Sequence, residues 1–190
     1  VSYSTFIDRR APLDWMRDVR EILHVSERLM RIARAHVPRL REPPSESTRR
    51  TLLDADLATL EAAGMPSSLL QQLRAAAAPS LELEPELQHG DLWPANVLRA
   101  DHKWWLIDFA ECGVVWSPLY DLLHLVATAP PAAGKAWYAI SEPGTDDIWL
   151  TARRTLLSEA ARRRRLSATQ LAGCLIYYLV HLTVYRLRPG

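Results

Sequence analysis

Apolar side chains recur every three or four residues along most of this 190-residue chain, and that spacing limits it to a mainly helical fold. A first helix, which we expect Asp14 to cap and Pro38 to end, carries such a face: Trp15, Val19, Ile22, Leu23, Leu29, Ile32 and Ala33. Further helices are predicted near 50–63, 67–77, 119–127, 149–164 and 168–186. The longest apolar run, 171–180, has about half of the ~20 residues that a membrane span needs, so it predicts a buried helix.

One stretch near the centre of the chain departs from the helical spacing. Two short apolar runs, 97–98 and 104–107, are joined by the polar residues 99–103, which is typical of a β-hairpin. Residues 1–7 have the composition of a single strand, and 41–48 and 130–147 read as loops. The predicted fold class is therefore α+β, mainly α-helical, with one small hairpin.

Composition excludes several classes of protein. Hydrophobic residues make up 48% of the chain, charged residues 24%, and the net charge is +1, which argues against disorder and bulk nucleic-acid binding. Cys112 and Cys174 form no Cys-x-x-Cys pair, which excludes a zinc ribbon and a disulfide scaffold and indicates a reducing compartment. The first residues lack the pattern of a signal peptide. We expect a cytoplasmic protein that binds neither membrane nor nucleic acid.

The familiar phosphate-binding loops are absent from the sequence. Lys103 and Lys135 are the only lysines, neither lies in a phosphate-binding loop pattern, and no Gly-x-Gly-x-x-Gly occurs. Residues 80–147, however, carry 11 acidic and 3 basic side chains. An acidic region of this kind suits a metal or cation site, and solvated loops account for it equally well.

The chemistry-bearing residues surround the predicted hairpin, in QHGDLWPANVL (88–98) and WWLIDF (104–109). Asn96 precedes the first strand and Asp108 follows the second, so both should lie at the open end of the hairpin. An amide oxygen and a carboxylate suit Mg²⁺, which takes its other ligands from water and substrate phosphates. Asp91 would lie beside the metal and accept a proton from an attacking hydroxyl. This arrangement predicts phosphoryl transfer.

His-Gly-Asp-x-x-x-x-Asn followed by Ile-Asp-Phe closely resembles the aminoglycoside phosphotransferase and choline kinase-like family, relatives of the protein kinases. The Asp121-Leu122 pair continues the family pattern in the next helix. Gly90 and Trp93 stand where protein kinases usually have Arg and Lys, as in small-molecule kinases. The resemblance is strong over residues 80–128.

The resemblance implies roles for the residues of the motif. Asp91 would be the catalytic base, Asn96 and Asp108 the metal ligands, and His89 and Asp121 the supports of the catalytic loop. The activity would move the γ-phosphoryl group of ATP (or GTP), with Mg²⁺, onto a hydroxyl of an aminoglycoside-, choline- or amino-alcohol-like molecule. Further contacts are predicted to the acceptor (Trp93, Glu111, Trp116 and Tyr120) and to the nucleotide (Leu98 and Ile107).

In this family a β-rich lobe with a glycine loop and a lysine comes first, and the sequence departs from that pattern. Residues 1–13 look like the hinge strand and linker that follow such a lobe, and 14–190 like the helical C-terminal lobe, with the catalytic loop and metal hairpin at 88–109. We expect the N-terminal lobe to come from the same protein or from a partner chain, and this chain alone to be a poor kinase.

Other interpretations remain open. The competing interpretation is a pseudokinase-like scaffold subunit that docks a partner protein or peptide. The aromatic residues predicted to contact the acceptor, Trp93, Trp116 and Tyr120, are also typical of core packing. Glu111 is also typical of a solvated loop. A zinc hydrolase using His102 and His124 with the aspartates is disfavoured, because His102 should lie at the far turn of the hairpin. The arginine run Arg162–Arg165 indicates a solvated end of a helix rather than a surface that binds nucleic acid or another anionic partner. Tyr177, Tyr178 and His181 are expected in the core.

Overall fold

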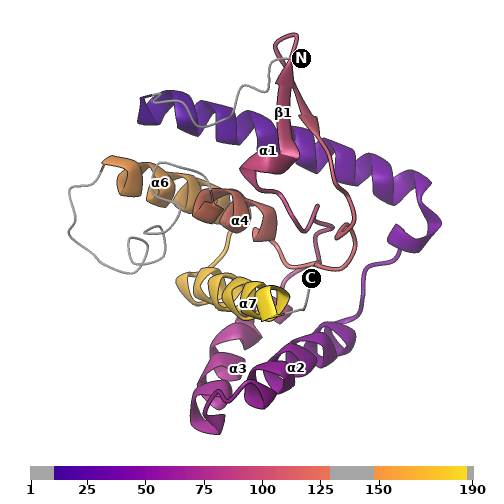
Figure 1. Ribbon diagram of the computed structural model, residues 1–190, viewed down its shortest axis with the longest axis vertical. Coiled ribbons are helices and arrows are strands. Elements are labelled where there is room, and N and C mark those ends of the chain that lie inside the picture. The colour runs from indigo at the N-terminus through magenta and orange to yellow at the C-terminus, as the bar shows by residue number, and fades with distance from the viewer. Residues whose placement is uncertain (1–10, 129–147, 188–190) are drawn as a thin grey trace.

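The computed structural model describes residues 11–128 and 148–187 (Figure 1). In chain order, its longer elements are α1 (Pro12–His36), α2 (Glu46–Ala62), α3 (Ser67–Leu81), β1 (Val97–Ala100), β2 (Lys103–Leu106), α4 (Tyr120–Thr128), α6 (Ile148–Arg163) and α7 (Ala168–Leu187). Two short 3₁₀ turns are η1 (Pro38–Leu40) and η2 (Pro94–Asn96). The described chain is thus mostly helical with a two-stranded antiparallel sheet, as predicted. The predicted strand at 1–7 and the predicted loop at 130–147 lie outside the described residues.

Helix α1 begins two residues earlier than the predicted cap. Pro12 occupies its first turn, where a missing N–H costs nothing, and Asp14 lies inside that turn. Pro12 and Leu13, assigned to the linker on sequence grounds, are therefore helical. The helix ends at His36, just before Pro38 as predicted.

Helices α2 and α3 are longer than the sequence predicted. Ser45 caps α2 by accepting the backbone N–H of Thr48 at 3.1 Å, so that helix begins at Glu46, inside the predicted loop. Helix α3 continues through Pro79 to Leu81. The proline lies in the last turn, where the lost backbone hydrogen bond affects only the end of the helix.

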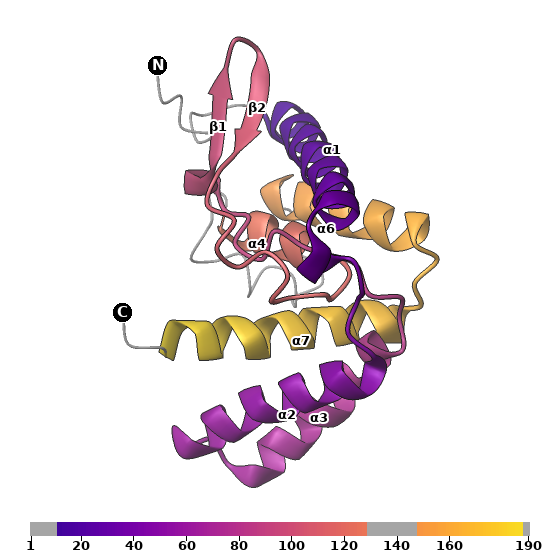
Figure 2. The ribbon, with the colours of Figure 1, turned by 90° about the vertical axis from the view of Figure 1, so that its right-hand side faces the viewer.

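The hairpin is tighter than the predicted five-residue connection. Val97 pairs with Leu106 and Ala100 with Lys103, so only two residues form the turn. These residues, Asp101 and His102, have φ values of 50° and 60°, as a two-residue hairpin turn requires. Figure 2 shows the hairpin projecting beside α1, far from α2 and α3.

Helix α7 lies at the centre of the packing. It packs against α2 and α3 on one side and α4 on the other, while α1 packs against α6 and β2 (Figures 1 and 2). Helix α7 is long and apolar enough to cross a membrane by length and composition alone, yet Cys174, Tyr178 and Val180 are buried within the protein. The prediction of a buried helix with tyrosines in the core is confirmed.

Candidate active site

The loop that carries the predicted catalytic residues runs from Gln88 to Asn96, between α3 and β1. Its conformation depends on Gly90, which has φ +88°. A Cβ atom at this position would lie 2.6 Å from the carbonyl oxygen of Glu111. Glycine is therefore required both by the backbone angle and by the close approach of the segment after β2.

Asp121, in the first turn of α4, holds this loop from beneath. Its buried carboxylate accepts the backbone N–H of His89 at 2.9 Å and that of Gly90 at 3.0 Å. Ser26 of α1 also donates its hydroxyl to the carboxylate, at 3.2 Å, and Gln88 accepts the N–H of Asp121 at 3.0 Å. Burial raises the pKa of Asp121, and the two backbone N–H groups act against that rise.

His89 links the loop to the end of β2. The imidazole is fully buried, with Nε2 3.0 Å from the carbonyl oxygen of Ile107 and Nδ1 accepting the N–H of Asp91 at 3.4 Å. A carbonyl can only accept, so these partners require a neutral ring with its proton on Nε2. The ring also lies 4.5 Å, centroid to centroid, from Phe109.

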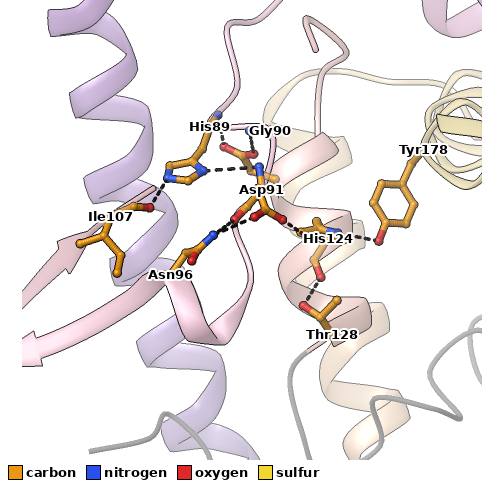
Figure 3. A network of polar contacts seen from close by, with 9 residues as sticks. His89, Gly90, Asp91, Asn96, Ile107, His124, Thr128 and Tyr178 are labelled. Atoms are coloured by element: carbon orange, nitrogen blue, oxygen red, sulfur yellow. Dashed lines mark hydrogen bonds and ion pairs between the residues drawn. The ribbon is translucent and has the colours of Figure 1, made fainter. Parts of the chain in front are cut away.

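Asn96 fixes the side chain of Asp91. The amide nitrogen of Asn96 donates to both the main-chain oxygen and Oδ2 of Asp91, each at 2.9 Å (Figure 3). Both amide hydrogens are thus used, and Oδ1 of Asn96 accepts no hydrogen bond from the described residues. Asn96 therefore keeps a free oxygen donor of the kind that Mg²⁺ binds.

Asp108 lies at the same end of the hairpin as Asn96. The N–H of Ile107 donates to the carbonyl of Asn96 at 3.1 Å, so Asp108 follows directly after that pairing. Asp108 is exposed, has φ +59°, and forms no hydrogen bond or ion pair with the described residues. Two uncommitted oxygen donors therefore occur where the sequence predicted a metal site.

Within the described ranges, no group of three or more His, Cys, Asp or Glu side chains gathers as a metal site. The candidate set is one amide and one carboxylate, Asn96 and Asp108. This donor set fits Mg²⁺, which completes its coordination with waters and substrate phosphates, and does not fit a structural zinc ion.

His124, which no motif marks as part of this mechanism, contacts Asp91 in the structure. His124 Nε2 lies 3.3 Å from Oδ1 of Asp91, and its Nδ1 lies 2.9 Å from the Tyr178 hydroxyl (Figure 3). The hydrogen bond from His124 is the main cause that lowers the pKa of Asp91, and burial opposes it. His124 follows Asp121 by three residues, so helical spacing would have placed both on one face of α4. No local signal points to Tyr178 or Ser26, which are distant in sequence.

The predicted acceptor residues divide into two groups. Trp93 lies in the loop and is 42% exposed, and Glu111 is half-buried beside Gly90. Trp116 and Tyr120, in contrast, are only 5% and 3% exposed. The Trp116 indole donates to the Gly113 carbonyl at 2.9 Å. Both aromatic side chains are core residues, because their rings pack against other buried side chains: Met30, Leu40 and Leu87 around Trp116, and His124, Tyr178 and His181 around Tyr120.

The hairpin has an apolar outer face next to Asp108. Trp105 is 56% exposed, Ile107 41% and Phe109 39%, and Leu98, which pairs with Trp105, is half-buried. The predicted nucleotide contacts, Leu98 and Ile107, thus lie on an open apolar surface rather than in the core.

His102 lies in the hairpin turn, at the opposite end from Asn96, so it does not join His124 and Asp91 in a metal site.

Arg164, predicted to be solvated, instead donates two hydrogen bonds to the Glu86 carboxylate, at 2.7 and 2.9 Å. This ion pair joins the end of α6 to the segment before the catalytic loop.

A cavity of about 680 Å³ lies on the other side of Asp121, between α1, α6 and residues 85–88. Its lining includes Ser26, Gln88 and Asp121, but neither Asp91 nor Asn96. The cavity is therefore separate from the candidate active site and lies behind the residues that support it.

A family model described as "Phosphotransferase enzyme family" matches residues 8–168, which include the catalytic loop, the hairpin and α4. No curated protein and no solved structure matches the chain. The family match covers most of the sequence and agrees with the resemblance of the His-Gly-Asp and Ile-Asp-Phe motifs to aminoglycoside phosphotransferases and choline kinases. The chain therefore belongs to the phosphotransferase enzyme family.

Proposed function

We propose that this chain is the helical lobe of a kinase that transfers the γ-phosphoryl group of ATP (or GTP) to a hydroxyl of a small molecule. Membership of the phosphotransferase family supports the general reaction. The observation that carries the proposal is the position of Asp91, whose carboxylate is held between Asn96 and His124 in a loop that Asn96 and His89 join to Ile107, one residue before Asp108.

Asp91 acts in this proposal as the group that receives the acceptor's proton. An aspartate whose pKa is not raised is ionised at neutral pH, so Asp91 can accept a hydrogen bond from the attacking hydroxyl. Phosphoryl transfer depends mainly on positioning and on stabilisation of charge, and the two hydrogen bonds to the carboxylate supply the positioning.

Asn96 and Asp108 would hold Mg²⁺ through Oδ1 and the carboxylate. Bound there, the ion supplies neutralisation of the charge on the nucleotide phosphates. His89 supports this arrangement from the protein side, because it joins the backbone of Asp91 to the carbonyl of Ile107, one residue before Asp108.

The apolar outer face of the hairpin supports a further part of the proposal. Trp105, Ile107 and Phe109 are large hydrophobic side chains with more than a third of their surface exposed. A nucleotide base and a β-rich lobe, from the same protein or from a partner chain, would cover them. That lobe would also supply the phosphate-contacting lysine, since neither Lys103 nor Lys135 lies in a phosphate-binding motif.

The proposed acceptor is an aminoglycoside-, choline- or amino-alcohol-like molecule. Trp93 lies in the catalytic loop and Glu111 beside it, and they offer an aromatic face and a carboxylate. Both groups attract a cationic nitrogen, and so does the acidic composition of residues 80–147.

Mg²⁺-dependent ATP binding by calorimetry, with ADP release from Mg-ATP in the presence of choline, ethanolamine or kanamycin, tests the proposal on the full protein. We expect Asp91→Ala to abolish ADP release and Asp108→Asn to remove the Mg²⁺ dependence of binding. Asp101→Asn is the matched control for Asp108→Asn, because both aspartates are exposed with positive φ, which asparagine tolerates. Full turnover by Asp91→Ala would contradict the proposal.

A scaffold subunit that docks a partner protein or peptide is the second candidate function. The exposed apolar hairpin face favours it, as does the lack of a lysine in a phosphate-binding motif. The same experiment separates the two functions: a full protein that binds neither ATP nor GTP in the presence of Mg²⁺ is a scaffold, and one that binds a nucleotide and releases the diphosphate with an acceptor is a kinase.

A further inference from the structure

Asp91 has a buried partner that the family motif does not include. His124 is 7% exposed and contacts Asp91 through Nε2 at 3.3 Å. Its other ring nitrogen contacts the hydroxyl of Tyr178, which is fully buried in α7. The chain Asp91–His124–Tyr178 therefore connects the catalytic loop through α4 to the central helix (Figure 3).

The geometry makes His124 a hydrogen-bond donor to Asp91. In the neutral ring, Nδ1 accepts the O–H of Tyr178, which leaves the proton on Nε2. In the protonated ring, both nitrogens donate, and the Tyr178 oxygen accepts. In either state the Nε2–H group faces Oδ1 of Asp91.

The two ends of the Asp91 carboxylate are consequently held by different partners. Asn96 holds Oδ2 from within the loop, and His124 holds Oδ1 from α4. With both bonds present, the carboxylate cannot turn without breaking one of them. Loss of His124 would leave only Asn96, whose own position depends on the same loop.

We propose that His124, oriented by Tyr178, is a positioning residue that holds the Asp91 carboxylate in the orientation in which it receives the proton of the acceptor hydroxyl. This inference rests on the proposed function and adds residues outside the catalytic motif. Tyr178 orients the imidazole, and its ring packs at 5.1 Å from Tyr120, which fixes the tyrosine in turn.

Kinetics on the full protein test the role, with ADP release from Mg-ATP as the readout. We expect His124→Leu to lower kcat by about 10- to 100-fold with little change in KM for ATP, because misplacing a reacting group by about 1 Å costs about 100-fold. His124→Gln should recover most of that loss, since its side-chain amide can donate to Asp91. A glutamine variant as slow as the leucine variant would overturn the inference.

Two controls separate positioning from stability. His181 is also 7% exposed and contacts an aspartate, Asp56, at 3.0 Å, but reaches His124 only through the rings of Tyr120 and Tyr178. We expect His181→Leu to change stability and to lower kcat per folded molecule far less than His124→Leu does. The double variant His124→Leu/Tyr178→Phe leaves no unpaired hydroxyl, so it should fold, as judged by circular dichroism, and remain slow.

Nitrogen-15 NMR of the His124 ring gives a readout that does not depend on activity. We expect the proton on Nε2 in the wild type and a tautomer mixture in Tyr178→Phe. A proton found on Nδ1 alone would refute the inference. If Asp91→Ala keeps its turnover, the proposed function fails; if Asp91→Ala is inactive while His124→Leu has normal kcat, only the role of His124 fails.

Discussion

The side chain of Asp121 accepts the backbone N–H of Gly90 at 3.0 Å, and this bond joins the first turn of α4 to the catalytic loop. A second oxygen of the same carboxylate accepts the N–H of His89 at 2.9 Å. One buried side chain thus satisfies two consecutive backbone groups at the start of the loop, before the 3₁₀ turn η2. The position of the candidate site therefore depends on α4.

Replacing Asp121 by asparagine should destabilise the protein. The asparagine amide has one oxygen and one NH₂ group, so the NH₂ group would face one of the two backbone N–H groups. That backbone N–H would have no acceptor, which costs about 1–3 kcal/mol. We expect a loss of that size in the free energy of unfolding, measured with urea. Asp54→Asn is the control, because Asp54 forms an exposed pair with Arg74 that is worth about 1 kcal/mol or less. Equal losses in the two variants would contradict this account of Asp121.

Substitution of Gly90 by alanine should cost more than substitution of Gly64. Both glycines have positive φ, +88° and +95°, so both variants pay a backbone strain of about 1 kcal/mol or more. Only Gly90 also faces a backbone oxygen, that of Glu111, at 2.6 Å from the added Cβ; nothing lies within 4 Å at Gly64. The difference between the losses of unfolding free energy in the two variants measures the cost of the contact between the added Cβ and the Glu111 oxygen. A Gly64→Ala variant as unstable as Gly90→Ala would rule out that contact as the cause.

Asp91 should titrate below the ordinary range of aspartate. The hydrogen bond from His124 lowers its pKa, so the ionised carboxylate is favoured in the folded state. Its contribution to stability is present above the unfolded-state pKa, about 3.9, and disappears as pH falls through the lower folded-state value. Carboxyl carbon-13 NMR should show this midpoint, and His124→Leu should raise it. An unchanged midpoint in that variant would show that His124 is not the cause.

The two cysteines should differ in reactivity. Cys174 is fully buried and burial raises the pKa of its thiol to about 12, while Cys112 is half-buried with a pKa that is also raised. With a thiol reagent at pH 8, we expect Cys112 to react slowly and Cys174 to react only on unfolding. Cys112→Ser should leave no reactive thiol in the folded protein. Rapid labelling of that variant would mean that α7 is not packed as described.

The ion pair between Arg164 and Glu86 should matter more than that between Arg20 and Glu159. Arg164 forms two bonds to Glu86 with a side chain that is 22% exposed, whereas the Arg20 side chain is 45% exposed. Arg164→Gln should lower the free energy of unfolding by about 1–3 kcal/mol. Arg20→Gln should cost about 1 kcal/mol or less, because water screens an exposed pair. Thermal and urea unfolding of both variants provide the comparison.

Local patterns in the sequence predicted much of the fold. The three-to-four-residue spacing identified the helices, and the paired apolar runs identified the hairpin, whose register puts Asn96 and Asp108 at one end as predicted. Helix ends were less well predicted. The Ser45 cap and the tolerance of Pro79 in a last turn both moved boundaries by several residues.

The sequence did not predict which of the aromatic side chains near the site are exposed to solvent. Trp93, Trp116 and Tyr120 look alike in sequence, as aromatic residues near prolines or the catalytic motif, yet only Trp93 is exposed. Which aromatic ring enters the core depends on what the neighbouring helices present to it. Met30 of α1 contributes to the cluster around Trp116, and Tyr178 of α7 packs against Tyr120.

The sequence by itself determined the helical class, the hairpin and the family, because each depends on residue types at short, regular spacing. Only the tertiary structure decided how the Asp91 carboxylate is held and which side chains support it. His124 is 33 residues from Asp91, and Tyr178 a further 54 along the chain. Contacts between such distant residues form only when α4 and α7 pack together, so no local pattern of residues contains them.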